Sequence, residues 1–255
     1  MSRHPLQNVR NRYLKALEIL KFENKLVKEL TSFKLRLSMD IDATVGGKPE
    51  RLKSVRVWHR GPLTDSVFKG GERFMHGITL SSIESHAAEM SVKCWIHSLP
   101  FGGSKGGVNI DPLKCTPEEL QNIAYKVVDE LDERNAIGPF IDVPAPDIGT
   151  NSLIMFWMAE RYKYRHRGKP FTKGVVTGKP VKLQNGNMGG INGRTEATGF
   201  GINVAIDELR KSKYDLFSLS ENPTVIMQGF GNVGSHAALF AAEKNFGIIA
   251  ICDKF

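Results

Sequence analysis

The stretch TVIMQGFGNVG, residues 224–234, decides the fold of the C-terminal part of this chain. TVIMQ predicts a short strand, the spacing G-x-G-x-x-G predicts a tight turn, and the apolar pattern of residues 233–244 predicts a helix. A second apolar run, IIAIC at 248–252, predicts another strand. The order strand, glycine turn, helix, strand is a βαβ unit, which begins a doubly wound dinucleotide-binding sheet.

The glycine turn also indicates a cofactor. Gly229, Gly231 and Gly234 would allow a pyrophosphate to approach the backbone at the positive end of the following helix. Asp253 ends the second strand, where a carboxylate accepts hydrogen bonds from ribose hydroxyls and repels a 2′-phosphate. We therefore expect NAD, with NADP possible. A glycine turn in another kind of α/β unit is the alternative that the motif alone leaves open.

Two domains of an α/β fold are expected. A glycine-rich segment at 168–193 separates the βαβ unit from a longer region before it. We assign residues 1–193 to an N-terminal α/β domain and residues 194–255 to the start of a Rossmann domain. A full doubly wound domain has about six strands, so this second domain is expected to be incomplete.

Composition narrows the function classes. Net charge is +8, but the basic residues are dispersed and match no nucleic-acid motif, so we expect anionic small molecules rather than nucleic acid as partners. No apolar run approaches the roughly 20 residues of a membrane span. Cys94, Cys115 and Cys252 lie far apart and predict neither a disulfide framework nor a metal site. We expect a cytoplasmic protein. The basic residues 1–22 resemble a transit peptide, but we favour an amphipathic first helix there, with Leu14, Leu17, Ile19 and Leu20 near one face.

The first domain carries several local signals. Alternating apolar residues predict strands within 33–58, and helical spacing predicts helices over 81–96 and from 151 to about 164. Thr116 followed by proline and Glu119 predicts a capping box and a helix start.

Three lysines and one aspartate are the candidate chemical groups of this domain. Lys105 lies in LPFGGSKGGVNIDP, residues 99–112, where the glycines predict a loop. Lys69 lies in FKGGERF, Lys93 in MSVKCW, and Asp147 in DVPAPDIGTN, where prolines stiffen the backbone. Each lysine alone could be an ordinary surface residue. Together with the fixed carboxylate they indicate a site.

These motifs carry a family resemblance. KGGERF, LPFGGSKGGV, DVPAPDIGTN, VTGKP, GRTEATGFG and QGFGNVG stand in the order and approximate spacing of glutamate dehydrogenases of the Glu/Leu/Phe/Val dehydrogenase superfamily. The resemblance covers nearly the whole chain. It implies an N-terminal substrate-binding and oligomerisation domain, a Rossmann domain that binds NAD(P), catalysis between the two, and a homohexamer.

The resemblance also implies roles for individual residues. Lys105 matches the catalytic lysine and Asp147 the acid/base carboxylate. Lys93 matches the lysine that binds the substrate α-carboxylate, and Lys69 the one that binds the side-chain carboxylate. Thr198 and Asn232 match contacts to the nicotinamide portion. The expected cofactor site comprises Thr198, Gly229, Gly231, Asn232, Val233, Gly234 and Asp253.

The implied reaction is oxidative deamination of L-glutamate to 2-oxoglutarate and ammonia. Relatives that act on leucine, valine or phenylalanine carry an apolar residue where Lys69 stands, and an apolar pocket would not repay desolvation of a second carboxylate. Two alternatives stay open. One is a catalytically silent, truncated paralogue kept for subunit assembly, and the other is a branched-chain or aromatic amino-acid dehydrogenase.

Two departures from the family pattern affect the site. Glu72 replaces an aliphatic residue and puts an acid close to Lys69, where an ion pair between the two would weaken recognition of the side-chain carboxylate. The segment 181–194 is several residues longer than the usual connection, so the loop near the cofactor is expected to differ.

Overall fold

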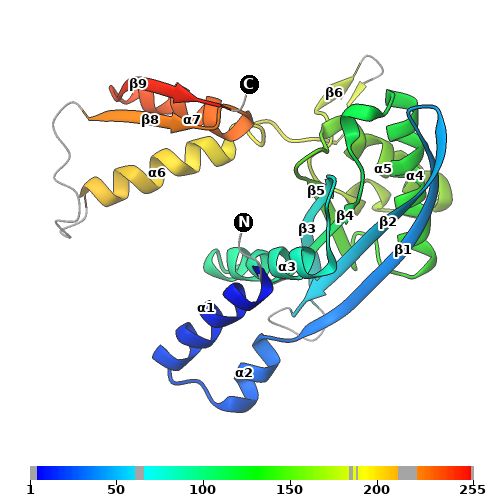
Figure 1. Cartoon of the computed structure of the whole chain (residues 1–255), viewed down its shortest axis with the longest axis horizontal. Helices are drawn as coiled ribbons and strands as arrows, with labels where there is room; N and C mark the ends of the chain where they lie inside the picture. Colours follow the sequence, from blue (N-terminus) through cyan, green and yellow to red (C-terminus); the bar gives the residue numbers. More distant parts are fainter. Residues whose placement is uncertain (1–4, 61–65, 184–185, 188, 212–222, 254–255) are drawn as a thin grey trace. The chain divides into compact units, whose positions relative to one another are not determined.

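The computed structural model describes residues 5–60, 66–183, 186–187, 189–211 and 223–253. The chain forms two compact units, Met1–Gly190 and Ile191–Phe255. Both contain helices and strands, so the chain has an α/β fold (Figure 1).

A five-stranded mixed sheet forms the centre of the first unit, with the strand order β1-β2-β4-β3-β5. Strands β1, β2 and β4 pair in an antiparallel manner, whereas β3 pairs in parallel with both β4 and β5. β4 and β3 therefore have neighbours on both sides, and β5 is an edge strand. The bounds are Phe33–Val45 for β1, Lys48–His59 for β2, Val67–Phe74 for β3, Phe101–Val108 for β4 and Asp142–Pro146 for β5.

Helices cover both faces of this sheet. Helices α4 (Pro117–Glu133) and α5 (Ser152–Arg165) pack on one face, and α3 (Leu80–Ile96) packs on the other (Figure 1). Helix α1 (Pro5–Ile19) lies against α3, and the short α2 (Asn24–Leu30) leads into β1.

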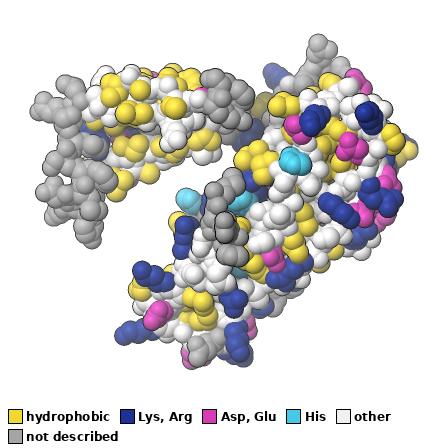
Figure 2. Space-filling model, viewed as in Figure 1, with side chains coloured by type: hydrophobic (Ala, Val, Ile, Leu, Met, Phe, Trp, Pro, Cys, Tyr) yellow, Lys and Arg dark blue, Asp and Glu magenta, His cyan; other side chains and the backbone are white. Residues whose placement is uncertain are grey.

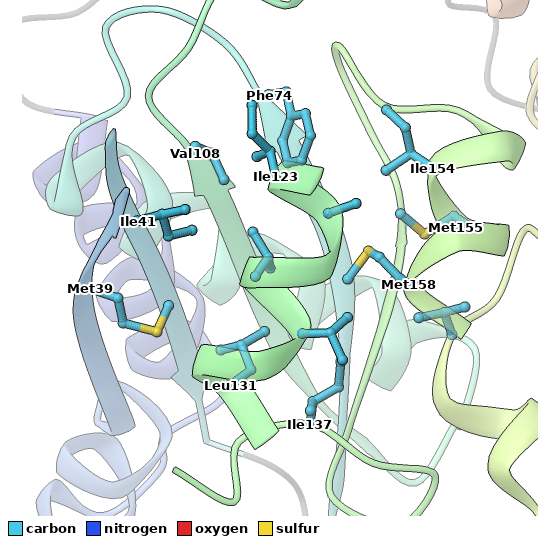
Figure 3. Packing of buried hydrophobic residues seen from close by; sticks show 14 of the residues in the cluster. Met39, Ile41, Phe74, Val108, Ile123, Leu131, Ile137, Ile154, Met155 and Met158 are labelled. Carbon is cyan, nitrogen blue, oxygen red and sulfur yellow. The ribbon is translucent and has the colours of Figure 1, made fainter. Parts of the chain in front are cut away.

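The larger hydrophobic core lies between the sheet and the helices α4 and α5. It joins Ile41 of β1, Phe74 of β3 and Val108 of β4 to Ile123 of α4 and Met155 of α5 (Figure 3). All five side chains are almost completely buried. This packing makes the sheet a rigid support for the polar groups on its other face.

The helix starts predicted from local sequence are confirmed. The Thr116 hydroxyl accepts a hydrogen bond from the Glu119 amide at 3.2 Å, and the Glu119 carboxylate accepts one from the Thr116 amide at 2.9 Å. Asn151 caps α5 through the amides of Leu153 and Ile154, both at 3.0 Å. Both signals act within four residues, which is why sequence alone reveals them.

The glycine loop expected at 99–112 is wrong, because residues 101–108 form the buried strand β4. KGGERF likewise lies in a strand, β3, and DVPAP forms β5. Glycine and proline are poor strand formers, but close packing of α3 on β4 requires glycine, and β5 tolerates prolines because it is an edge strand.

The second unit contains the predicted βαβ order. Strands β8 (Thr224–Gln228) and β9 (Gly247–Cys252) pair in parallel and are connected by helix α7 (Asn232–Glu243). Helix α6 (Ala197–Lys211) packs against α7. The Asn203 side chain joins these two helices by donating to the backbone oxygens of Gly199 at 3.1 Å and Ala237 at 2.9 Å.

Four short elements complete the described structure: the turns of 3-10 helix Pro112–Lys114 and Thr172–Val175, and the paired strands β6 (Lys182–Leu183) and β7 (Gly186–Asn187). The latter two lie in the longer connection, of which residues 184–185 and 188 fall outside the described residues.

The described helices include none that is both long and apolar enough to cross a membrane. Basic side chains are interspersed with acidic and apolar ones on the face shown in Figure 2, in agreement with the dispersed charge of the sequence.

Candidate active site

The candidate chemical groups of the first unit share the sheet face that α3 covers. Lys105 of β4 pairs in register with Val57 of β2, whose side chain packs against α3. Lys69 pairs with Gly103, two residues before Lys105, and side chains two residues apart in a strand point to the same face. Lys93 is an exposed residue of α3 itself. Three lysines that lie far apart in sequence are thus brought to one face.

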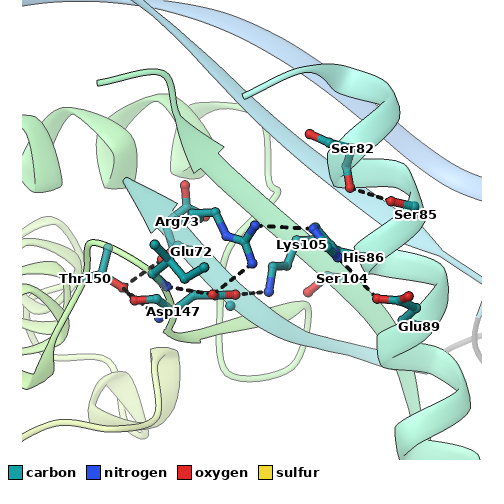
Figure 4. A network of polar contacts seen from close by, with 12 residues as sticks. Glu72, Arg73, Ser82, Ser85, His86, Glu89, Ser104, Lys105, Asp147 and Thr150 are labelled. Atoms are coloured by element: carbon teal, nitrogen blue, oxygen red, sulfur yellow. Dashed lines mark hydrogen bonds and ion pairs between the residues drawn. The ribbon is translucent and has the colours of Figure 1, made fainter. Parts of the chain in front are cut away.

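Asp147 directly follows β5 and contacts two cations of this face (Figure 4). Its carboxylate forms an ion pair with the Lys105 ammonium and accepts a hydrogen bond from Arg73 Nη2 at 3.1 Å. It also accepts one from the Ile148 amide at 2.6 Å. The structure therefore brings one of the candidate lysines into contact with the candidate carboxylate.

The backbone around Asp147 is also held in place. Its amide donates to Thr150 Oγ1 at 2.8 Å, and the Thr150 hydroxyl lies 2.8 Å from the Glu72 carbonyl oxygen, to which it can donate. At Gly71 an added Cβ would lie 2.6 Å from Asp147 Oδ2, so only glycine leaves room there for the carboxylate. These contacts fix the acid independently of any ligand.

The electrostatic surroundings make Lys105 an unusual lysine. Burial, followed by the charges of Arg73, Lys93 and Arg56, lowers its pKa from an ordinary value near 10.4 to about 7. A large share of the amine is then neutral at neutral pH, which is the state that accepts a proton from a reacting group.

Lys69 is affected in the same direction. Burial and the nearby guanidinium of Arg56 lower its pKa to about 8. The Asp142 carboxylate opposes this shift. Lys69 stays mainly protonated at neutral pH, so it is suited to holding an anionic group.

A second charged cluster lies on the opposite face of the sheet, directly behind the lysines. Arg56 is fully buried and forms a bidentate pair with Asp142, with distances of 2.6 and 2.7 Å. Ser104 Oγ accepts from Arg56 at 2.9 Å and donates to Asp142 at 2.7 Å. The Trp58 indole donates to the same carboxylate at 2.5 Å. We call these four residues and Glu72 the Arg56 cluster.

The expected ion pair between Glu72 and Lys69 is wrong. Glu72 lies on the other sheet face and pairs with Arg56 Nη1 at 2.9 Å. Burial raises the pKa of Glu72 to about 7, and the carboxylate of Asp142 adds to this while Arg56 opposes it. One buried cation thus serves two carboxylates, and the departure from the family pattern leaves the Lys69 ammonium unblocked by Glu72.

The glycines beside Lys105 permit close packing on both faces. An added Cβ at Gly103 would lie 2.2 Å from the Ala87 carbonyl oxygen and 2.3 Å from the Ser91 amide nitrogen of α3. At Gly106 it would lie 2.0 Å from Glu72 Oε2. These residues therefore bring α3 and the Arg56 cluster close to the lysine strand.

The second unit contains the predicted dinucleotide turn. Gly229 has φ +89, a conformation that favours glycine, and among the described residues no heavy atom lies within 4 Å of a Cβ built on Gly231. At Gly234 such a Cβ would lie 2.0 Å from the Gly229 carbonyl oxygen. This turn precedes α7, so its residues fit a pyrophosphate at a helix N-terminus.

The other predicted cofactor residues lie in the same unit as this turn. The Asp253 carboxylate accepts a hydrogen bond from the Phe230 amide, which places it beside the turn. The Asn232 side chain donates to the Thr195 carbonyl oxygen at 2.9 Å and links the start of α7 to the segment before α6. Thr198 is exposed in the first turn of α6, and Val233 is 39% exposed in α7.

Sequence reasoning missed several residues of the first site. Arg73 lies in the same motif as Lys69, and Asp142 lies in the same motif as Asp147. Their positions could therefore have marked them as charged members of the site. Arg56 gave no comparable signal, because its partner Asp142 is 86 residues away. His86 of α3, which contacts Arg73, gave none either.

The comparisons with known proteins agree with this arrangement. Residues 28–164 match the model of the Glu/Leu/Phe/Val dehydrogenase dimerisation domain, and residues 189–255 match that of the glutamate/leucine/phenylalanine/valine dehydrogenases. The chain belongs to the Glu/Leu/Phe/Val dehydrogenase family. The predicted resemblance to this family is therefore confirmed.

Curated relatives of this chain are named glutamate dehydrogenases. That of Aeropyrum pernix is 32% identical over 254 residues, which cover 98% of this chain and 57% of the relative. The mitochondrial enzyme of Dictyostelium discoideum is 38% identical over 72% of this chain and 37% of the relative. Others include an NAD-specific enzyme of Bacillus subtilis and an NADP-specific enzyme of Synechocystis. The chain spans about half the length of the curated relatives it matches.

A solved structure shows the same fold. The hetero-hexameric glutamate dehydrogenase of Thermus thermophilus, in a leucine-bound form, superposes with a TM-score of 0.86 at 28% identity. The match covers 100% of this chain and 58% of that chain.

Proposed function

We propose that this chain serves the oxidative deamination of L-glutamate to 2-oxoglutarate and ammonia. The contact between Lys105 and Asp147, on the same sheet face as Lys69, is the observation that carries the proposal. A lysine with a lowered pKa beside a fixed carboxylate supplies both proton-transfer groups that the reaction needs.

Each residue has a separate part in the proposed mechanism. The glycine turn at Gly229, Gly231 and Gly234 would hold the cofactor, which would supply a nicotinamide as the acceptor for the hydride of the substrate Cα. Lys105, as the neutral amine, takes a proton from the water that attacks the resulting iminium carbon. Asp147 transfers protons to and from the amine nitrogen. Arg73 keeps the Asp147 carboxylate in position for this exchange through the hydrogen bond described above.

Two lysines account for the proposed choice of substrate. Lys93 would bind the α-carboxylate, and Lys69 would bind the side-chain carboxylate as a compact positive charge. Glu72 is occupied by Arg56, so Lys69 keeps its charge for an anionic side chain. Leucine, valine and phenylalanine offer no such group, and their binding would leave the buried Lys69 ammonium unpaired.

We propose NAD as the cofactor, with NADP possible. Asp253 beside the glycine turn favours the ribose hydroxyls of NAD over a 2′-phosphate, and the relatives include NAD-specific and NADP-specific enzymes. A hexameric assembly of identical chains in the cytoplasm completes the proposal. The Thermus structure supports a hexamer, although its subunits are of different kinds.

The test has a binding part and a catalytic part. Calorimetry should show that the purified chain binds 2-oxoglutarate, and Lys69→Leu should weaken this roughly 100-fold through the lost charge pair, with Lys34→Leu as the control on an exposed lysine. Glutamate and NAD should produce NADH absorbance that Lys105→Ala lowers at least about 100-fold.

The outcomes separate the candidate functions. Tight binding of 2-oxoglutarate without NADH formation by a folded chain would favour the catalytically silent assembly subunit. If leucine or phenylalanine is turned over faster than glutamate, the chain is a branched-chain or aromatic amino-acid dehydrogenase instead. Full activity in Lys105→Ala would overturn the assigned mechanism.

A further inference from the structure

Arg73, which holds Asp147, is itself held by a histidine of helix α3 that no assigned role uses. Arg73 Nη1 lies 3.3 Å from His86 Nε2, and His86 Nδ1 lies 3.2 Å from Glu89 Oε2 (Figure 4). The contacts therefore run without a break from Glu89 through His86 and Arg73 to Asp147.

The donor and acceptor roles in this chain of contacts are fixed by chemistry. A guanidinium can only donate, so His86 Nε2 must be the acceptor and carries no proton. The ring proton then lies on Nδ1, from which it is donated to Glu89. The arrangement requires neutral His86 in its Nδ1–H form. A protonated ring would place a second N–H donor and a second positive charge against Arg73.

We propose that His86 and Glu89 form a positioning pair that aims Arg73 at Asp147, and that the pair works only while His86 is neutral. The catalytic part of this inference rests on the proposed function of Asp147. The positioning part rests on the contacts alone. His86 touches neither Lys105 nor Asp147 in these contacts, so it acts through Arg73.

The other features of Arg73 strengthen this assignment. Its Nε is buried and has no hydrogen-bond partner among the described residues. The orientation of the guanidinium therefore depends on the contacts of Nη1 with His86 and of Nη2 with Asp147. Loss of the His86 acceptor would leave one restraint, the bond to Asp147.

The charged groups that face His86 all bear on its protonation. Burial lowers the pKa of His86, the hydrogen bond that His86 donates to Glu89 of α3 opposes this, and the charges of Arg73 of β3 and Lys105 of β4 add to the lowering. An ordinary histidine titrates near pH 6.5. His86 is therefore neutral at physiological pH and takes up its proton only in more acidic solution, where the hold on Arg73 is lost.

The first test is the protonation site of His86 in the wild-type chain. Long-range proton–nitrogen NMR on the chain labelled with 15N-histidine, at about pH 8 where His86 is neutral, should show the proton on Nδ1. A proton on Nε2 would overturn the proposal, because that nitrogen could not then accept from Arg73.

The second test measures how firmly Arg73 is held. Its reaction rate with phenylglyoxal, followed by peptide mass spectrometry, should rise roughly fivefold in His86→Leu, which lacks the acceptor. His86→Gln keeps an acceptor and a donor and should react like wild type. His97→Gln, an exposed histidine at the end of the same helix, is the matched control. Equal Arg73 rates in His86→Leu and wild type would contradict the proposal.

The pH profile separates positioning from a merely structural role. Relative to His86→Gln, wild-type Arg73 should become more reactive as the solution is acidified through the pKa of His86. If deamination is observed, its kcat should fall over the same range in wild type and not in His86→Gln, with KM little changed. Parallel profiles of the two proteins would overturn the requirement for neutral His86.

These readouts also distinguish this inference from the proposed function. A protected Arg73 in a chain that forms no NADH would support the positioning pair and count against the deaminase alone. If the chain is an active deaminase and Arg73 reacts with phenylglyoxal at the same rate in wild type and in His86→Leu, the result would count against the positioning pair alone.

Discussion

Two glycine-rich segments of this chain use the same residue for different physical reasons. In β4, a Cβ at Gly103 or Gly106 would lie within 2.2 Å of another atom, so these glycines permit close packing on both faces of a buried strand. In the dinucleotide turn, Gly229 has a positive φ and the described residues leave the space beside Gly231 open. In the first case glycine lets elements of the same chain pack closely together. In the second case it leaves open space beside the turn.

Glycine content alone therefore does not predict a loop. The turn at 229–234 can be recognised because a strand precedes it and a helix follows it. The GGSKGG segment of β4 has no such local context, since what crowds it comes from α3 and from the Arg56 cluster. Substitutions should therefore affect the stability of the first segment and the ligand affinity of the second.

The largest effect is expected from removal of the cation packed beside Gly106. Arg56→Met leaves the buried Asp142 and Glu72 without their shared partner and should lower the free energy of unfolding of the first unit by about 3 to 5 kcal/mol. All three tryptophans, at positions 58, 95 and 157, lie in this unit, so their fluorescence during urea unfolding reports on it alone.

Arg51→Met on the same strand is the matched control, because Arg51 and its partner Asp42 are exposed. This substitution should lower the free energy of unfolding of the first unit by less than about 1 kcal/mol. Equal effects of the two substitutions would show that the Arg56 cluster adds nothing beyond a surface ion pair.

A smaller loss of stability is expected from overpacking β4. Gly103→Ala places a methyl group against backbone atoms of Ala87 and Ser91, which cannot move without displacing α3. The first unit should lose about 2 to 3 kcal/mol in the same urea experiment. A stability equal to that of wild type would mean that α3 does not approach β4 as closely as described.

The smallest effect on stability is expected from the same substitution in the turn. Gly231→Ala adds its methyl group in open space at the N-cap position of α7, where glycine is preferred to alanine, and should lower the free energy of unfolding by less than about 1 kcal/mol. Affinity for NADH, measured by its fluorescence, should fall roughly tenfold, or about 1.4 kcal/mol. Unchanged NADH affinity would count against this turn as the pyrophosphate site.

The sequence predicted the features that depend on neighbouring residues. The Thr116 cap with Glu119, and the turn that begins with Gly229, are both set within a few residues and were confirmed. β4 could not be predicted, because its partners in the sheet and on α3 override a local composition that is poor for strands.

The candidate site was predictable as a set of motifs but not as a geometry. Lys105 and Asp147 stand in recognisable motifs, and the structure brings their side chains into contact. Arg56 and His86 are not marked by any local pattern, because their partners come from other elements. The local sequence around a charged residue does not reveal which distant residue it will contact in the folded chain.

The most direct test of the account is the titration of the Lys105 amine. Competitive acetylation with peptide mass spectrometry across pH gives its midpoint in the folded chain, without substrate or cofactor. Because the folded-state pKa lies below the ordinary value, the amine should be neutral above a midpoint of about 7. Asp147→Asn should lower the midpoint further, since the ammonium loses its carboxylate partner. A midpoint near 10.4, as in an exposed lysine, would contradict Lys105 as the proton-transferring amine.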